Sequence, residues 1–284
     1  AGILFASPWF VGFLVFTAFP IFASIYFSFT DYDILSEPYW IGLENYIEML
    51  NWDPSFWKSL WNTTYYVLFS VPLQLIIGLV IALILNADIK GIAVYRTMYY
   101  MPSIVPIVAS SILWSWMFNP NYGLLTLAVE AFGVDAPAWL GDPAWAKPSL
   151  IIMSLWGAGG GMIIYLAGLK NIPNTYYEAA ELDGAGAWMR FWKITLPLLT
   201  PTLFFQLIMG IIGSFQVFTQ AFMMTSGGPN DATLFYVLHL YRNAFQFWRM
   251  GYASAMAWVL FAIIMIFTLI NWVGSKYWVN YDLS

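Results

Sequence analysis

The chain has 284 residues, of which 61% are hydrophobic and only 9% are charged, whereas ordinary soluble domains carry about 25% charged residues. It contains no cysteine, so disulfides and thiolate-ligated metals are excluded. The net charge of −5 and the isoelectric point of about 4.7 argue against a nucleic-acid partner. The composition therefore indicates an integral membrane protein that is solvated by lipid.

Six segments contain no Lys, Arg, Asp or Glu: residues 1–30, 59–87, 97–129, 148–169, 194–230 and 250–275. Each exceeds the roughly 20 apolar residues that cross a membrane as a helix. Their apolar residues are continuous and do not alternate, which favours helices over a β-barrel. The first segment lacks the basic region of a secretory signal and is too long to be one. We predict an all-α membrane protein with one domain over residues 1–284 and six transmembrane helices, at about 3–29, 60–87, 101–118, 149–169, 200–223 and 250–273.

Positively charged residues between the predicted spans set the expected orientation, because loops rich in Lys and Arg stay in the cytoplasm. With a cytoplasmic N-terminus, the inner side carries Lys90, Arg96, Lys170, Arg190, Lys193 and Lys276. The outer side carries fewer: Lys58, Lys147, Arg242 and Arg249. We therefore predict that both termini are cytoplasmic.

The outer loops have features of their own. Residues 40–50 place apolar side chains on one helical face, as a helix lying at the membrane interface would. Residues 120–147 are rich in Pro and Gly and predict a compact turn-rich loop. Residues 232–247 are aromatic but too short and too polar for a span, so a short amphipathic or re-entrant helix is expected.

Residue types needed for catalysis are almost absent from the predicted spans. The single histidine, His239, is predicted to be structural, since metal sites need several converging ligands. The spans lack the ionisable residues that proton-coupled carriers use, and no G-x-x-x-x-G-K-[ST] phosphate loop occurs. Gly157 and residues 159–161 predict close helix packing or an unwound stretch facing a cavity. If the chain takes part in transport, the energy for it must therefore come from another polypeptide.

The segment between the fourth and fifth predicted spans carries the strongest local signal. Thr175 and Glu178 have the spacing of a capping box, which predicts a short helix beginning near Thr175. Gly184 ends it, and a second amphipathic stretch follows at residues 188–194. These patterns leave two interpretations open, a capped interfacial loop or a docking element for another protein.

A longer match decides between them by resemblance. Glu178-Ala179-Ala180, Gly184, Ile194 and Leu196-Pro197 match in spacing the E-A-A loop of binding-protein-dependent ABC importer permeases. The chain also resembles the sugar-importing, maltose-permease-like branch of that family through G-L-E-N-Y at 42–46, M-F-N-P at 117–120, A-W-L-G-D-P at 138–143 and S-G-G-P-N at 226–230.

This resemblance implies the type I ABC importer permease fold in a bacterial or archaeal cytoplasmic membrane. The implied partners are a second homologous permease subunit, two ATPase subunits that carry ATP and Mg, and an external substrate-binding protein; no cofactor is expected in this chain. The coupling loop spans residues 170–199, and its contact with the ATPase is assigned to Glu178, Ala179, Ala180, Asp183 and Gly184.

Polar and small residues within the apolar spans predict where a substrate would pass. In the fifth span Gln206, Gly210 and Ser214 share one helical face. The resemblance places sugar contacts at Ser103, Ile107, Trp156, Gly157, Gly210, Ser214 and Val217, and Gln216 is added as a further polar group. Three positions that are polar in the related permease are Ile107, Gly210 and Val217 in this chain. The resemblance therefore predicts the location of the substrate site better than its specificity for one sugar. Interhelical hydrogen bonding for the polar residues, and packing for Trp156, are the alternatives.

We predict a non-catalytic permease subunit that translocates a sugar or oligosaccharide by alternating access. Within the same family, a polyol, a glycerophosphodiester or a sugar phosphate is the alternative cargo. A stand-alone secondary carrier or a membrane enzyme would need intramembrane ionisable groups that the spans lack.

Overall fold

A computed structural model describes residues 2–87 and 90–280, and most of them are helical. In this part of the chain, five helical stretches are long and apolar enough to cross a membrane: Ala6–Ser28, Pro54–Leu85, Pro143–Lys170, Ala187–Met224 and Met250–Ser275. A sixth is a pair of helices bent by 96°, Ile92–Ile104 and Ile107–Met117. The six predicted spans are therefore present if the bent pair counts as one.

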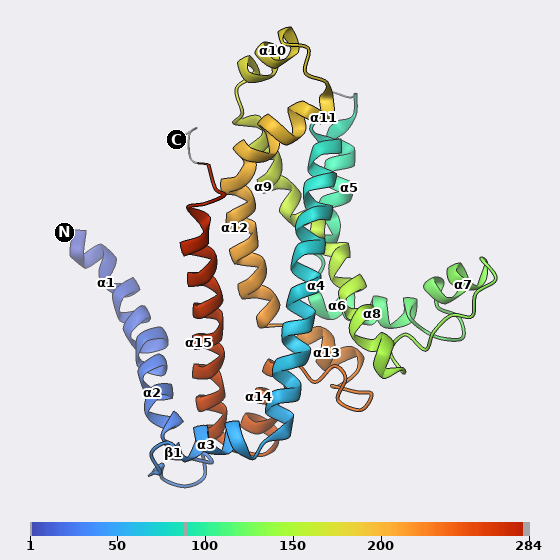
Figure 1. The fold of residues 1–284 in the computed structure, drawn as a ribbon. Coiled ribbons are helices and arrows are strands. Elements are labelled where there is room, and N and C mark those ends of the chain that lie inside the picture. The colour runs from blue at the N-terminus through green and yellow to red at the C-terminus, as the bar shows by residue number, and fades with distance from the viewer. Residues whose placement is uncertain (1, 88–89, 281–284) are drawn as a thin grey trace.

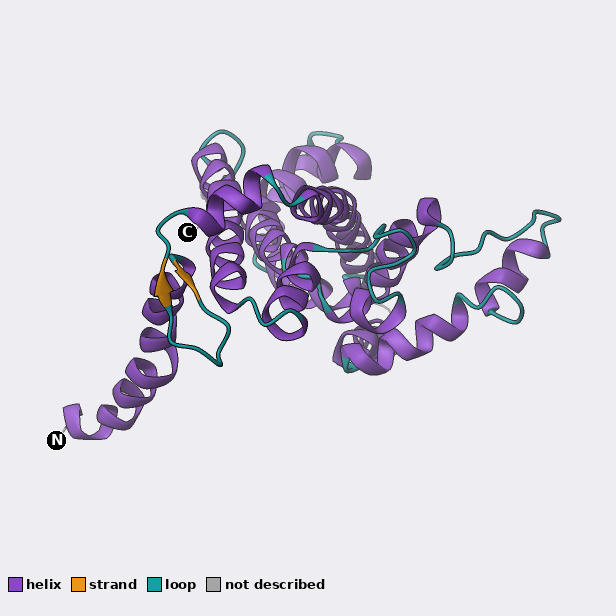
Figure 2. Ribbon diagram, turned by 90° about the horizontal axis from the view of Figure 1, so that it is seen from below, coloured by secondary structure: helices purple, strands orange, loops and turns teal. Residues whose placement is uncertain are grey.

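The first span leans away from the other helices, as Figures 1 and 2 show. It consists of α1 (Gly2–Phe13), a π-helical turn η1 (Leu14–Ala18) and α2 (Phe19–Ser28). The α2 helix packs against α15 (Met250–Ser275), where Trp258 Nε1 donates to Ser24 Oγ at 3.2 Å. A short antiparallel pair, β1 (Thr30–Asp31) and β2 (Tyr39–Trp40), then turns the chain.

The second span, α4 (Pro54–Leu85), lies at the centre of the bundle. Asp53 caps its N-terminus by accepting from Ser55 N at 2.9 Å, so the helix begins before the predicted residue 60. The short helix α3 (Glu44–Asn51) precedes it, as expected for residues 40–50. Two apolar cores surround α4, one toward α12 and α15 and the other toward α9.

The third span differs from its prediction as one helix over residues 101–118. It begins earlier, as α5 (Ile92–Ile104), and continues after a sharp break as α6 (Ile107–Met117). Pro106 lacks a backbone N–H and pushes Val105 into an extended conformation with ψ 128°. That conformation ends α5 and turns α6 away from it.

The loop predicted to be compact over residues 120–147 is instead an extended arm. It carries α7 (Leu124–Glu130) and reaches away from the bundle in Figures 1 and 2. Its base is anchored by Trp139, which packs on Phe118 and donates from Nε1 to Thr126 Oγ1 at 3.0 Å. The proline and glycine content predicted that turns occur in this loop, but not that the loop extends away from the bundle.

The fourth span contains α8 (Pro143–Leu155), a 3₁₀ turn η2 (Trp156–Ala158) and α9 (Gly159–Lys170). Its glycines serve both predicted purposes. At Gly159 a Cβ atom would lie 1.9 Å from the Tyr99 carbonyl oxygen, so glycine permits close packing of α5 on α9. The 3₁₀ turn just before it is the unwound stretch.

The fifth span contains the long helix α12 (Leu196–Phe215). Shorter helices precede and follow it: α10 (Asn174–Leu182), α11 (Ala187–Arg190), η3 (Phe191–Thr195), α13 (Thr219–Met224), α14 (Tyr236–Tyr241) and η4 (Arg242–Gln246). The predicted fifth helix over 200–223 is interrupted at residues 216–218, between α12 and α13. As predicted, residues 232–247 form no span.

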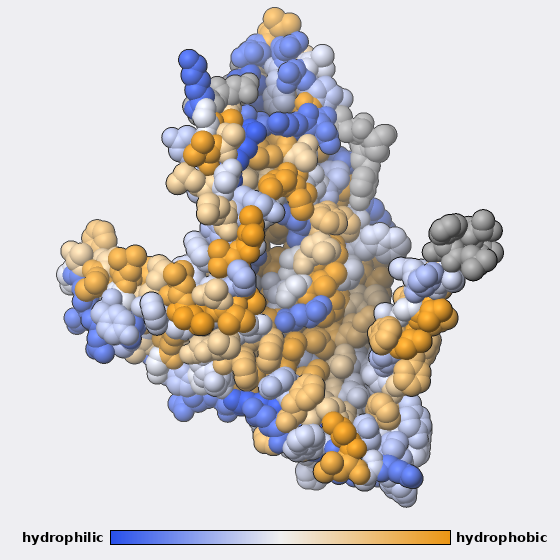
Figure 3. All heavy atoms as spheres, turned by 180° about the vertical axis from the view of Figure 1, so that it is seen from behind, coloured by the Kyte–Doolittle hydropathy of each residue, from blue (hydrophilic) through white to orange (hydrophobic). Residues whose placement is uncertain are grey.

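The two ends of the bundle are called the α10 end and the α3 end after the helices that lie there (Figure 1). On the face shown in Figure 3, hydrophobic side chains cover most of the middle of the molecule. Hydrophilic side chains gather around α10. This distribution suits a bundle whose middle faces lipid and whose ends face water.

Candidate functional site

A cavity of about 530 Å³ lies among α4, α5, α6, α8, α12 and α13. All eight residues predicted to contact substrate line it: Ser103, Ile107, Trp156, Gly157, Gly210, Ser214, Gln216 and Val217. They come from three spans that are far apart in the sequence. We call this space the outer cavity; a sugar-contacting role for its residues stays a prediction.

Each of three spans is interrupted where it borders the outer cavity. The breaks are at Val105–Pro106, in the 3₁₀ turn at Trp156–Ala158 and at residues 216–218. In the hydrocarbon region, irregular backbone is tolerated only inside protein or beside a polar cavity. Broken helices at such a site expose peptide groups to a ligand.

The lining of the outer cavity mixes polar and apolar side chains and carries no ionised side chain in the described part of the chain. Gln74 Nε2 donates to Ser154 Oγ at 3.1 Å across the wall. Trp156 is 36% exposed and meets Trp114 edge-on, with ring centroids 6.2 Å apart. Amide and hydroxyl groups beside an indole ring suit a neutral polyhydroxylated ligand. The ligand hydroxyls can form hydrogen bonds with the amides and hydroxyls, and a sugar ring can stack on the indole.

Several lining residues were not among the predicted contacts. Gln74, Ser154 and Tyr66 also face the cavity, from α4 and α8. Gln74 and Ser154 are polar residues inside charge-free segments, which is the signal that identified Gln206 and Ser214 in the fifth span. Applying that signal to the second and fourth spans would have found both.

The residues predicted to couple to an ATPase lie on and just beyond α10. Glu178 and Ala179 are exposed on the helix, and Asp183 and Gly184 follow at its C-terminus. Gly184 has φ +78° and donates to Glu181 O at 3.0 Å, while Ala185 N donates to Ala180 O at 2.8 Å. This is a Schellman motif, which requires the left-handed residue that glycine supplies.

The predicted capping box at the start of α10 is wrong. The helix begins at Asn174, directly after Pro173, and no side chain caps it. Thr175 therefore lies inside the first turn, where its hydroxyl cannot act as an N-cap. Pro173 occupies the N-cap position instead, and its fixed φ angle suits the start of a helix.

Two contacts join α10 to the helix that follows it. The Tyr177 hydroxyl and Thr195 Oγ1 form a hydrogen bond of 3.0 Å. Glu181 pairs with Arg190 at 3.1 Å. Neither pair was predicted, because the partners are separated by a glycine turn of undetermined geometry. They connect α10 to α11 and η3, which lead without interruption into α12.

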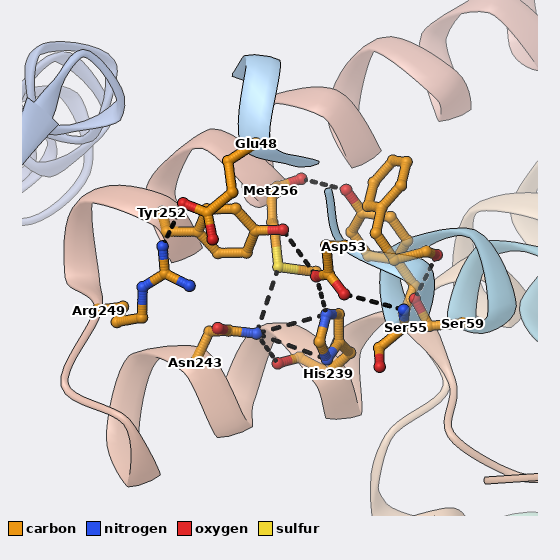
Figure 4. A network of polar contacts seen from close by, with 11 residues as sticks. Glu48, Asp53, Ser55, Ser59, His239, Asn243, Arg249, Tyr252 and Met256 are labelled. Carbon is orange, nitrogen blue, oxygen red and sulfur yellow. Dashed lines mark hydrogen bonds and ion pairs between the residues drawn. The ribbon is translucent and has the colours of Figure 1, made fainter. Parts of the chain in front are cut away.

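The single histidine belongs to a polar network at the α3 end, drawn in Figure 4. Its Nε2 lies 2.8 Å from Asp53 Oδ2, and Tyr252 donates to the same oxygen at 2.7 Å. Asn243 Nδ2 donates to the His239 carbonyl oxygen at 3.0 Å. Burial raises the pKa of Asp53, but the bonds from His239 and Tyr252 lower it further, to a net value below its ordinary one.

A structural role for His239 stays a prediction, and its contacts are consistent with that role. The network joins α4, α14 and α15, and no group of three or more potential metal ligands occurs among residues 2–87 and 90–280.

Comparison with known proteins gives the family. Residues 3–276 match the family described as "Binding-protein-dependent transport system inner membrane component". The chain belongs to this family of permeases. A probable ABC transporter permease protein of Bacillus subtilis, YesP, is 48% identical over 99% of this chain and 92% of its own length. The trehalose/maltose transport system permease protein MalF of Thermococcus litoralis is 35% identical over 95% and 91% of the two chains.

Solved structures agree on the fold of this permease. A chain of a bacterial ABC transporter involved in the import of the acidic polysaccharide alginate superposes with a TM-score of 0.83 at 24% identity. The match covers 97% of this chain and 95% of that one. The permease therefore has the fold of an ABC importer subunit. Its family, not this superposition, identifies it as an inner membrane component.

Proposed function

We propose that this permease subunit translocates a neutral sugar or oligosaccharide, delivered by an external binding protein, by alternating access. A second, similar permease subunit completes the pathway, and two ATPase subunits dock at the α10 end. In this arrangement the α10 end and both termini are cytoplasmic, and ATP and Mg bind to the ATPase subunits alone.

The uncharged lining of the outer cavity carries the proposal for the cargo. A phosphorylated or acidic ligand entering a low-dielectric site needs a paired cation, because an unpaired buried charge is very costly. The described lining residues supply amides, hydroxyls and Trp156 but no cation. Relatives named for trehalose and maltose, and for lactose in Rhizobium radiobacter at 32% identity, support a sugar.

The proposal for coupling rests on the exposure and attachment of α10. Glu178 and Ala179 are exposed, and Leu182 at the end of the helix is 91% exposed, which suits a docking surface. The bonds at Tyr177 and Glu181 attach this surface to the segment that leads into α12. A displacement of α10 would therefore reach the wall of the cavity.

Uptake by the complete transporter in proteoliposomes tests the cargo. The external binding protein is first screened for thermal stabilisation by neutral sugars, sugar phosphates and glycerophosphodiesters. We expect stabilisation and ATP-dependent uptake with a neutral sugar. Uptake of only a phosphorylated ligand would contradict the proposal, and uptake driven by an ion gradient without ATPase subunits would replace it with a secondary carrier.

Two substitutions test the coupling surface. Glu178→Lys reverses a charge on α10, and Gly184→Asp disrupts the Schellman motif. Both are expected to reduce co-purification of the ATPase subunits and substrate-stimulated ATP hydrolysis. Glu37→Lys, an exposed charge reversal far from α10, is the matched control for co-purification. Unchanged co-purification and hydrolysis in both α10 variants would show that the coupling role is wrong.

A further inference from the structure

A second cavity, of about 250 Å³, adjoins the outer cavity on the side nearer α10. It lies among α4, α9 and α12 and is about half as large. Gln74, Gly157, Met209 and Gly210 line both cavities and so form the boundary between them. We call this space the inner cavity.

Gln206 is the polar side chain that distinguishes the inner cavity. It lies two helical turns from Ser214 on the same face of α12, which is about 12 Å along the axis. Glycine at position 161 makes room for it, because a Cβ there would lie 2.4 Å from Gln206 Nε2. In the described part of the chain the Gln206 amide has no hydrogen-bond partner, whereas the Gln74 amide is bonded to Ser154.

Tyr165 supplies a second unpaired polar group in the wall of the inner cavity. Its side chain is almost fully buried at 1% exposure, and its hydroxyl has no hydrogen-bond partner among the described residues. A buried hydroxyl without a partner is unfavourable. A glutamine whose only function was to bind neighbouring helices together would be bonded across the interface, and Gln206 is not.

We propose that the inner cavity is a second binding station, which holds one ring of the neutral polyhydroxylated cargo after it leaves the outer cavity. The Gln206 amide donates to and accepts from ring hydroxyls, and the Tyr165 hydroxyl pairs with another. The lining residues given by the structure include no ionised side chain, so the station takes an uncharged ligand. This inference rests on the proposed function, because the ligand is the transported sugar.

The station has a consequence for kinetics. Cargo first meets the outer cavity, so loss of the inner station leaves recognition of the loaded binding protein intact. It removes the favourable step that draws the sugar toward α10, and the rate of transport falls. The constant KM for the loaded binding protein and the maximal uptake rate therefore respond differently to substitutions in the two cavities.

The test measures sugar uptake by the assembled transporter in proteoliposomes with the sugar that the binding protein carries. Gln206→Leu is expected to lower maximal uptake about tenfold, the effect of one to two lost hydrogen bonds, while KM changes by less than about twofold. Gln206→Met, which keeps the length of the side chain, and Tyr165→Phe repeat the test should Gln206→Leu fail to assemble. The matched control is Gln246→Leu, an exposed glutamine of η4 that lines neither cavity.

The outcomes separate this inference from the proposed function. If wild-type protein transports a sugar but Gln206→Met and Tyr165→Phe both match Gln246→Leu, the inner station does not exist. If Ser214→Val in the outer cavity leaves uptake unchanged while the Gln206 variants reduce it, the outer site is misplaced and the inner station stands. If wild-type protein takes up only a charged cargo, both proposals are overturned.

Discussion

Replacing Asp53 tests whether the network at the α3 end holds α14 against α4 and α15. Its carboxylate accepts from Ser55 N at 2.9 Å, His239 Nε2 at 2.8 Å and Tyr252 Oη at 2.7 Å. Hydrogen bonds to an ionised group contribute about 1.5–3 kcal/mol, and neutral ones about 0.5–1.5 kcal/mol. Asp53→Asn keeps the cap, but its NH2 group takes the place of Oδ2 and cannot accept from His239 and Tyr252, so we expect a loss of about 2 kcal/mol. Asp53→Ala also loses the cap, for a total of about 3 kcal/mol.

Amide hydrogen exchange in α14 measures this loss, because exchange there requires local opening. Each 1.4 kcal/mol is tenfold, so exchange should be about 30-fold faster in Asp53→Asn and more than about 100-fold faster in Asp53→Ala. Asp142→Asn is the matched control, since Asp142 caps α8 through Ala144 N at 2.9 Å without joining the network. Exchange in Asp53→Ala within about twofold of wild type would refute the reasoning.

The pH dependence of amide exchange in α14 tests the same network in a second way. The pKa of Asp53 is lower in the folded protein than its ordinary value, because the bonds from His239 and Tyr252 outweigh the effect of burial. A carboxyl of this kind contributes stability that is present above its ordinary pKa and is lost as pH falls through the folded pKa. Protection of α14, corrected for intrinsic exchange, should therefore hold down to about pH 4 and decline below it. The decline should be absent in Asp53→Asn.

Three further substitutions test local geometry. Gly159→Ala would place a Cβ 1.9 Å from a backbone oxygen of α5, so thermal unfolding in detergent should show a loss of about 1–3 kcal/mol; Gly157→Ala, with no atom within 4 Å, should show none. Gly184 has φ +78° and open space around it. Gly184→Ala should therefore cause only backbone strain, of about 1–2 kcal/mol, which should appear as faster amide hydrogen exchange in α10. A double-mutant cycle of Tyr177→Phe and Thr195→Val, read by the same exchange, should give an interaction energy of about 1 kcal/mol; an energy near zero would show that this bond does not hold α10.

The number and approximate positions of the spans could be predicted because the membrane imposes one requirement on every crossing helix. A charge inside the hydrocarbon region is costly whatever surrounds it, so charge-free segments identify spans without knowledge of tertiary contacts. The predicted ends of the helices were wrong where capping extends a helix beyond its charge-free segment. Asp53 caps α4 well outside the charge-free segment that begins at residue 59, and α5 begins at Ile92, before the charge of Arg96.

The glycines of the fourth span indicated its unwound stretch, but the breaks at Pro106 and at residues 216–218 were not predicted. Pro72 lies inside the uninterrupted helix α4 and Pro201 inside α12, whereas Pro106 separates α5 from α6. A proline in a membrane helix can be accommodated when neighbouring groups satisfy the freed carbonyl. Which prolines break a helix therefore depends on the surrounding helices and not on local sequence.

The residues of the outer cavity could be predicted from the resemblance, because the chain has the fold of an ABC importer subunit and the matched positions come together in it. The contacts that connect α10 to the rest of the chain could not. Tyr177 and Thr195 meet only because the Schellman turn at Gly184 reverses the chain by a particular angle. Sequence spacing predicts that a turn occurs near Gly184 but not its geometry. That geometry depends on tertiary packing, including the buried cluster that contains Ile172 and Leu199.

The helix α12 connects the two candidate sites physically. The Tyr177 bond ends at Thr195, directly before α12, and Gln206, Gly210 and Ser214 then face the two cavities from one side of that helix. From Thr195 to Ser214 the helix rises about 29 Å, nearly the thickness of the hydrocarbon core. A shift of α10 that moves α12 as one unit would displace the walls of both cavities together. The break at residues 216–218 then allows α13 to stay with α6, against which it packs. Movement of α12 relative to α13 would change the opening of the outer cavity, which is the kind of change that the proposed alternating access requires.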